Sequence, residues 1–360
     1  MFRKVLSFIA LAGVSYANAQ DSTSTPLTIS GSVDTYYKYD FAKVPNIGTS
    51  FATDQNSVSL GMIDVLLKKS TGKASFVGEV SFGPRGQSQS IPDQAIASTA
   101  SGTDFSFSSF HIQNLYASYA FTDKFSMTAG YMGTFVGYEV ISPVGNFNYS
   151  TSYLFTNGPF QNAGIKANYA VSDKVGLMVG MFNNTWNTYT ADPISGVSTF
   201  GAQLSLSPVE GWSAYLNLLT GYDSGTILDL TTAYQITDKF KLGLNAADWS
   251  AGMGADDTGY YGAALYPSFA VTDGFALGLR GEYFKTKKNG GVAVGAPADE
   301  SVTSLTLSGN LKSGGLTFIP EFRMDNGSVE SFYKKPADVV LGVPTTKSAS
   351  QFSLAVVYAF

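Results

Sequence analysis

The residues that could perform hydrolytic chemistry gather around His111, the single histidine of the chain. Ser108 and Ser109 precede it, and Gln113 and Asn114 follow, so a Ser-His-Asn set of the kind that hydrolyses esters can be drawn from neighbouring positions. Neighbouring side chains on a strand face opposite sides, which makes closeness in the sequence weak support for catalysis. A histidine at a loop base or in a polar lumen explains the same residues, and we expect no enzyme.

Two acidic pairs, Asp256-Asp257 and Asp299-Glu300, offer carboxylate oxygens of the type that bind Ca²⁺. Neither pair has the spacing of a dedicated calcium loop, so we interpret both as solvated loop residues and expect no metal. The chain has no cysteine, which excludes thiolate zinc and disulfide chemistry. Glycine-rich phosphate loops are also missing, and we expect no cofactor.

The elements that would position any site begin with an export signal. Arg3 and Lys4 are followed by the apolar run 5–14 and by Ala17-Asn18-Ala19, which is the charged, apolar and small-residue order of a secretory signal. We predict a signal peptide over residues 1–19 and a mature domain over 20–360. The apolar run is too short for a membrane helix, which needs about 20 apolar residues, and no later run approaches that length.

Charge and composition narrow the class of protein. Removing the signal takes away two of the 22 basic residues and none of the 27 acidic ones, which leaves a net charge of −7. Nucleic-acid binding is excluded because it needs clustered basic residues. Only 14% of the residues are charged and another 14% are aromatic, against about a quarter charged in a soluble domain. A wall with one apolar face and one lightly polar face gives such averages.

A short turn recurs along the chain. An aromatic residue, a gap of two and a Thr-Asp or Ser-Asp pair stand before each new alternating run, as small polar residues do in tight hairpin turns. Between the turns, apolar and polar residues alternate with a period of two, which indicates strands. The four copies are Tyr119–Lys124, Tyr169–Lys174, Tyr234–Lys239 and Phe269–Gly274.

The alternation predicts about sixteen strands. They begin near residues 27, 57, 73, 109, 124, 162, 174, 199, 211, 226, 239, 259, 274, 301, 314 and 351. Tight turns alternate with mostly long loops, a layout typical of barrels whose turns are periplasmic and whose loops are extracellular. Hydrocarbon offers a strand edge no hydrogen-bond partner, so such a sheet must close. We therefore predict an all-β fold, a transmembrane antiparallel β-barrel in the outer membrane of a Gram-negative bacterium.

Alternation also orients the charged residues, because a charge on the lipid face is costly. It directs six of them to the lumen: Asp34, Lys38, Arg280, Glu282, Glu321 and Arg323. Aromatic rings just before the tight turns are expected to form a girdle at the periplasmic interface: Tyr119, Phe121, Tyr169, Tyr234 and Phe269. The alternative interpretation is that these rings are ordinary strand aromatics of a soluble barrel. Tyr358 and Phe360 end the last strand and resemble the signal that outer-membrane assembly machinery selects.

The long segment 134–161 contains too many aromatic residues for an ordinary solvated loop. It is the third long loop, which in sixteen-stranded porins folds into the barrel and narrows the pore. We predict that Glu139, Asn146, Asn148 and Tyr149 line this constriction and face wall residues such as Arg280 and Arg323. The alternative is that Glu139 and the asparagines only hold the loop against the wall.

The sequence here resembles the OmpL-like β-barrel porins of Gram-negative bacteria. The resemblance implies a barrel and a pore, and it covers most of the mature chain. It departs from the usual pattern of the family at Tyr131 and at Asn162–Gly164, so it implies no particular solute. It rests on Leu27–Tyr37, Thr128–Gly130, Gly137–Glu139, Asn148–Ser150, Tyr153–Phe155, Gly158-Pro159 and Asn184–Trp186.

Together these observations favour a porin that admits ions and small hydrophilic solutes by passive diffusion, with a mild cation preference from the acidic balance. A barrel whose long loops serve adhesion or anchoring is a second hypothesis, and a barrel hydrolase centred on His111 is a third. The expected partners are membrane lipids and lipopolysaccharide, the assembly machinery and the solutes. A homotrimer stays open at this point.

Overall fold

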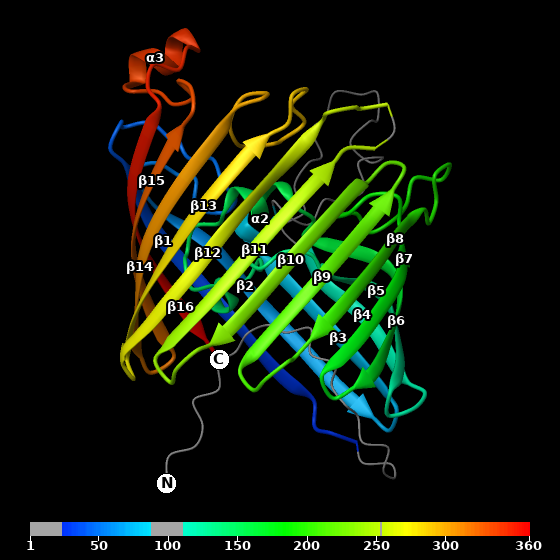
Figure 1. The fold of residues 1–360 in the computed structure, drawn as a ribbon. Helices are drawn as coiled ribbons and strands as arrows, with labels where there is room; N and C mark the ends of the chain where they lie inside the picture. Colours follow the sequence, from blue (N-terminus) through cyan, green and yellow to red (C-terminus); the bar gives the residue numbers. More distant parts are fainter. Residues whose placement is uncertain (1–23, 88–110, 253) are drawn as a thin grey trace, which may run out of the picture.

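The computed structural model describes residues 24–87, 111–252 and 254–360. These residues form sixteen strands in one closed barrel, in which each strand pairs antiparallel with its neighbours in the sequence and β1 pairs with β16 (Figure 1). The strands are β1 (Thr28–Asp40), β2 (Ser57–Thr71), β3 (Ala74–Phe82), β4 (His111–Ala120), β5 (Phe125–Gly133), β6 (Gln161–Ser172), β7 (Val175–Phe182), β8 (Thr199–Leu206), β9 (Trp212–Gly221), β10 (Gly225–Gln235), β11 (Phe240–Ser250), β12 (Gly259–Thr272), β13 (Phe275–Thr286), β14 (Ser301–Ser313), β15 (Leu316–Gly327) and β16 (Ser348–Ala359).

The predicted fold is confirmed. The structure has sixteen strands, and each begins within three residues of its predicted start. The expected signal peptide, residues 1–19, lies outside the described part of the chain.

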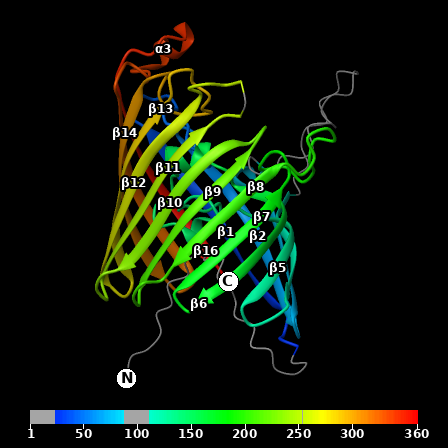
Figure 2. The same ribbon diagram turned by 45° about the vertical axis from the view of Figure 1, so that its right-hand side comes forward.

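The helices of the described residues are all short and belong to loops. They are α1 (Pro84–Gln87), the 3₁₀ helix η2 (Pro143–Gly145), α2 (Tyr153–Asn157) and α3 (Pro336–Leu341). None of them is long and apolar enough to cross a membrane. In Figure 1, α2 lies inside the barrel, whereas α3 projects beyond the ends of the strands in both Figures 1 and 2.

Four register shifts interrupt the ladders of the described strands: two lie beside the short turns, at the ends of β6 and β12, and two are β-bulges in the body of β2 and β4. In β2, one extra residue lies between Leu60 and Ile63, opposite Val33–Thr35 of β1. In β4, Gln113 is the extra residue where the strand pairs with β3. A bulge moves every later side chain to the other face of the sheet, so both runs change phase along their length.

Pro320 lies in β15 and pairs with Leu354 of β16. On its other side the ladder to β14 is interrupted, because pairing resumes only at Ser308 with Glu321 and at Leu311 with Phe318. Proline has no N–H to donate. The barrel therefore tolerates Pro320 by a local gap in one ladder and keeps the other intact.

The two ends of the barrel differ in the length of their connections. The short turns, at the periplasmic end, span residues 72–73, 121–124, 173–174, 207–211, 236–239, 273–274 and 314–315. At the extracellular end lie L1 (41–56), L2 (83–110, described to 87), L3 (134–160), L4 (183–198), L5 (222–224), L6 (251–258), L7 (287–300) and L8 (328–347). The loop end thus carries most of the chain that is not strand.

The outer surface is apolar, and aromatic rings lie close to the short turns. Side chains such as Leu228 (58% exposed) and Leu305 (50% exposed) point away from the lumen. Of the residues predicted to form a periplasmic girdle, Tyr119, Phe121, Tyr169 and Phe269 are exposed and Tyr234 packs against Trp212 with ring centroids 5.7 Å apart. Such a surface suits hydrocarbon bounded by an interface.

The last strand closes the barrel through its end. The backbone N–H of Phe360 donates to the carbonyl of Gly31, and the N–H of Gly31 donates to the carbonyl of Phe360, both at 3.1 Å. The side chains of Tyr358 and Phe360 are exposed. The chain terminus is therefore part of the seam between β1 and β16.

Candidate functional site

L3 leaves the end of β5, runs through the lumen and returns to β6. Positive φ at Gly137 (91°), together with Pro143 and Pro159, keeps the segment from continuing as a strand. Ser152 caps the short helix α2, because its hydroxyl accepts a hydrogen bond from the N–H of Phe155 at 3.0 Å. L3 therefore has a defined conformation of its own.

The loop lies against glycines of the barrel wall. A Cβ built on Gly278 of β13 would lie 2.2 Å from the ring of Phe147, and a Cβ on Gly243 of β11 would lie 2.2 Å from the hydroxyl of Tyr138. Any larger residue at these two positions would displace the L3 aromatics. The wall is thus shaped to receive the loop.

Arg280 of β13 forms the central ion pair of the lumen with Glu139 of L3, at 2.6 Å between Nη1 and Oε1. The second carboxylate oxygen of Glu139 accepts from the N–H and the hydroxyl of Ser152, at 2.7 and 2.6 Å. The same guanidinium donates to the carbonyls of Ser150 and Thr151, at 2.6 and 3.2 Å. Both charges are buried, and these hydrogen bonds replace most of the water contacts that each would otherwise need, while Nε of Arg280 is left without a partner.

Two wall carboxylates bind the backbone of L3 in the same way. Glu321 of β15 accepts from the N–H groups of Tyr149 and Ser150, at 2.8 and 3.1 Å. Glu282 of β13 accepts from the N–H groups of Tyr153 and Leu154, at 3.0 and 2.9 Å, where α2 begins. A carboxylate at the first amides of a helix satisfies donors that have no partner within the helix.

Arg323 of β15 completes this set. It donates to both oxygens of Asp325, at 2.8 and 3.0 Å, and to the carbonyl of Thr151 at 2.8 Å. The hydroxyl of Tyr153 donates to Asp325 at 2.6 Å. We call Arg280, Glu282, Glu321, Arg323 and Asp325 the clamp, since all five hold L3 to β13 and β15.

Tyr149 is fully buried and connects L3 to the opposite side of the seam. Its hydroxyl donates to Asp34 of β1 at 2.5 Å, and Asp34 also accepts from the N–H of Met62 at the bulge of β2, at 2.9 Å. Arg85 of α1 lies 3.6 Å from Asp34 and places its guanidinium over the ring of Tyr149 at 4.7 Å. L2 and L3 thus share one buried contact at β1.

The remaining predicted residues hold loops in place. Asn146 bonds within L3 to the N–H and carbonyl of Val140, at 2.9 and 2.6 Å. Asn148 donates to Ser308 of β14 at 2.7 Å. Lys38 of β1 reaches the carbonyls of residues 47 and 53 in L1, at 3.4 and 3.3 Å. Asn148 thus joins L3 to the wall, whereas Asn146 bonds only within L3.

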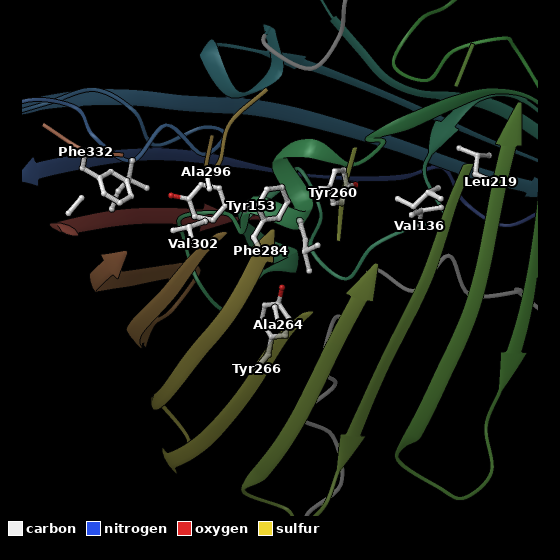
Figure 3. Close-up of a cluster of buried hydrophobic side chains, with 14 of the residues drawn as sticks. Val136, Tyr153, Leu219, Tyr260, Ala264, Tyr266, Phe284, Ala296, Val302 and Phe332 are labelled. Carbon is white, nitrogen blue, oxygen red and sulfur yellow. The ribbon is translucent and has the colours of Figure 1, made fainter. Parts of the chain in front are cut away.

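An apolar cluster lies inside the barrel beside the clamp (Figure 3). L3 contributes Val136, Tyr153 and Leu154, and the loops L1, L7 and L8 add Ile47, Ala296 and Phe332. Wall side chains meet them from the strands: Phe182, Leu219, Ile227, Tyr260, Ala264, Tyr266, Phe284, Val302 and Ala349. Tyr138 of L3 stacks on Tyr266 with ring centroids 4.3 Å apart. The side chains of this cluster therefore pack against one another much as in the core of a soluble domain.

The periplasmic half of the lumen is different. Its inward-facing side chains are polar and partly exposed, among them Tyr116, Lys166, Tyr215 and Lys241. Asp64 of β2 accepts a hydrogen bond from the N–H of Ser32 at 2.8 Å. This half keeps groups that water can reach, whereas the other half encloses its charges.

The geometry brings Glu139 into direct contact with Arg280, where the sequence predicted that they face each other across a throat. Sequence reasoning missed Arg85, Asp229 and Asp325. The period-two alternation could have identified both acids as lumen-facing, since Asp325 lies two residues from Arg323 and on the same face. Asp229 accepts a hydrogen bond from the N–H of Gly137 at 3.0 Å. Arg85 lies in a loop, where no periodicity applies.

The described residues contain no arrangement that supports the hydrolase hypothesis or the calcium hypothesis. Ser108 and Ser109 lie outside the described residues, and His111 is placed only by its backbone, which pairs with Ser81. Asp299 forms a surface ion pair with Lys285 at 2.9 Å. Within the described residues no group of three or more acidic or histidine side chains could hold a metal ion.

Comparison with solved structures finds outer-membrane barrels of low sequence identity. An anion-selective porin from Comamonas acidovorans is 13% identical, with a TM-score of 0.60 over 94% of this chain and 100% of that chain. OprB of Pseudomonas putida is 11% identical, with a TM-score of 0.61 over 93% and 94%. OmpT of Vibrio cholerae, in its trimer form, is 12% identical, with a TM-score of 0.58 over 94% and 99%. At these identities the likeness concerns the fold.

The sequence itself carries the assignment. No curated protein matches it. The family model described as "Putative beta-barrel porin-2, OmpL-like" matches residues 26–360, which is almost the whole of the described barrel. The chain belongs to this family of porin-like outer-membrane barrels.

Proposed function

We propose that the protein is a passive channel that lets ions and small hydrophilic solutes diffuse across the outer membrane, with L3 as its fixed constriction. The observation that carries this proposal is the clamp, which holds L3 inside a sixteen-stranded barrel by buried bonds. A barrel of this strand number is wide enough for water. The channel needs neither chemical turnover nor energy coupling, which fits the porin family and the porin neighbours.

Selectivity belongs to the same proposal. The net charge of the mature chain predicts a mild cation preference. Glu139 is the acidic residue that we propose at the constriction, so it is the first to test. Net charge, however, counts every carboxylate, including those that are buried and bonded to L3. Ions respond to the charges that face water in the channel.

Single-channel recording tests the channel. Mature protein, residues 20–360, would be refolded and inserted into planar bilayers, and stable open steps are expected. Glu139→Gln should change the step size, because it breaks the ion pair to Arg280 and loosens the loop. Glu330→Gln, an exposed change in L8, is the matched control and should leave the steps unaltered. Silence from a folded, heat-modifiable barrel would refute the channel.

Export and assembly complete this proposal. We infer that the signal is cleaved after Ala19 and that the strand ending in Tyr358 and Phe360 is selected by the assembly machinery. Sequencing of the protein purified from outer membranes should begin at Gln20. A homotrimer is proposed by analogy with the trimer form of Vibrio cholerae OmpT, and cross-linking in native membranes checks it.

A second function, adhesion through the long loops, is favoured by one observation. The helix α3 of L8 presents Val340 and Leu341, which are 87% and 74% exposed, at the extracellular end. Apolar side chains grouped at a loop tip mark contact surfaces. Cells that carry a Val340→Ser and Leu341→Ser protein should attach less to a surface than cells with the unaltered protein, and equal attachment would remove this reading.

A further inference from the structure

Two lysines in the periplasmic half of the lumen differ from every member of the clamp. Lys166 lies in the middle of β6, and its neighbours Ile165 and Tyr169 expose 52% and 48% of their surface on the outside of the barrel. Alternation therefore turns Lys166 inward. Lys241 lies two residues from Gly243, whose Cβ position faces Tyr138 of L3, so Lys241 also points into the lumen.

These lysines carry charges that no other group offsets. Among the described residues, neither forms an ion pair or a side-chain hydrogen bond. Both are partly exposed. By contrast, Arg280 and Arg323 are fully buried and each bonds a carboxylate. The cations of the clamp serve the loop, and those of the periplasmic half stay available to a solute.

A carboxylate pair lies on another part of the wall. Asp64 of β2 is bonded to Ser32, and Glu79 of β3 is bonded to Asn114, so both acids have neutral partners. In the closed barrel, β3 and β11 are eight strands apart in either direction. Lys241 and Glu79 therefore belong to opposite sides of the lumen, whereas Lys166 of β6 lies three strands from β3.

We propose that Lys166 and Lys241 are the anion-contacting residues of the channel and give its periplasmic half a preference for small anions such as chloride, carboxylates and inorganic phosphate. Unpaired charges on a low-dielectric wall concentrate counter-ions in the water beside them. The expected sign is opposite to that predicted from the net charge, since the acidic residues of the clamp are buried and bonded. This inference rests on the proposed channel function.

The test is the reversal potential of the refolded protein in a potassium chloride gradient. The unaltered channel should favour chloride, and Lys166→Gln with Lys241→Gln should lower the chloride-to-potassium permeability ratio by at least about twofold. The matched control is Lys124→Gln with Lys239→Gln, both exposed in the periplasmic turns, which should leave the ratio unchanged. An equal shift in the control, or no shift in the double variant, would overturn the proposal.

Two further measurements separate the possible failures. Inorganic phosphate added to one side at low salt should reduce the chloride current of the unaltered channel more than that of the double variant. If the double variant does not fold, Lys241→Gln alone serves in its place, because Lys241 is the second residue of β11. This single variant should lower the chloride-to-potassium permeability ratio by a smaller amount. A channel that conducts with unaltered selectivity in both variants refutes only the role of the lysines, whereas absence of any current refutes the channel itself.

Discussion

The extracellular and periplasmic halves of this lumen are built from one barrel and follow different rules. In the extracellular half, L1, L3, L7 and L8 pack on the wall, and the charges of the clamp have buried partners. In the periplasmic half, the wall is lined by partly exposed polar side chains, and Lys166 and Lys241 have no partner in the described residues. One half behaves as a protein core and the other as a surface turned inward.

The difference teaches that the charge content of a lumen and its electrostatic effect on solutes are separate quantities. A buried ion pair that satisfies all its donors has little field left at a distance, although removing one partner is costly. A single unpaired lysine in a narrow channel has the opposite properties, because it contributes little to stability and acts on every passing ion. Counting acidic and basic residues does not distinguish them.

The largest expected effect would break the clamp. Arg280→Met leaves Glu139 buried without its cation and two L3 carbonyls without a donor, so the free energy of unfolding should fall by about 3–5 kcal/mol. Denaturant unfolding of the refolded barrel in lipid measures this. Lys285→Met is the control, because its pair with Asp299 is exposed and worth at most about 1 kcal/mol. Equal losses in the two variants would contradict the buried-clamp interpretation.

Next comes a test of the two kinds of packing. Phe284 is fully buried in the apolar cluster, so Phe284→Ala should lower the free energy of unfolding by about 3 kcal/mol. Tyr215 is partly exposed in the periplasmic half, so Tyr215→Ala should lower the free energy of unfolding by only about 1 kcal/mol. The same unfolding assay measures both variants. If the Tyr215 variant were the less stable one, the contrast between the halves would fail.

A smaller effect concerns the single hydrogen bond between L3 and β1. Tyr149→Phe removes the hydroxyl that donates to Asp34 at 2.5 Å and keeps the ring beneath Arg85. The buried carboxylate loses one donor, and stability should fall by about 1–2 kcal/mol. Tyr358→Phe, an exposed ring at the seam, is the control for loss of a hydroxyl. A neutral result at Tyr149 would show that Arg85 and Met62 suffice for Asp34.

The smallest effect lies outside the barrel, in L8. The Thr345 hydroxyl, together with the N–H groups of Lys334 and Lys335, holds the pKa of Asp338 below its ordinary value. Because the folded pKa is depressed, this contribution to the order of α3 is present at neutral pH and is lost as the pH falls through the folded pKa. NMR shifts of the Lys334 and Lys335 amides should titrate with a midpoint below that of a free Asp, and Asp338→Asn should abolish the titration.

The fold could be predicted because a barrel strand repeats one simple rule over many residues. Period two and the recurring Thr-Asp or Ser-Asp turns predicted the number and position of the strands. The alternation of residues 57–68 and 109–120 slips phase in the sequence, and the structure has a β-bulge in each of these runs, in β2 and β4. Pro320 lies where the ladder to β14 is interrupted, as expected of a residue without an N–H.

The site was less predictable because its contacts join loops to distant strands. Alternation indicates the face on which Arg280 lies, and it says nothing about whether that residue meets water or a carboxylate. The pair with Glu139 depends on the path of L3, which in turn depends on glycines such as Gly278 far along the chain. No sequence pattern pointed to Arg85, because it lies in a loop. Lys166 looks like any other strand lysine in the sequence, and only the structure shows that it has no partner among the described residues.

The clamp also has a consequence for the order of assembly. Tyr149 and the carboxylate that binds its backbone, Glu321, are 172 residues apart in the chain. L3 belongs to the first half of the protein and its anchors to the last strands, so the loop has no place to settle until β13 and β15 have joined the sheet. Contacts of such long range form late, since the chain must first lose the entropy of a large loop. The interior of this barrel is therefore expected to become ordered last, as the seam between β1 and β16 closes.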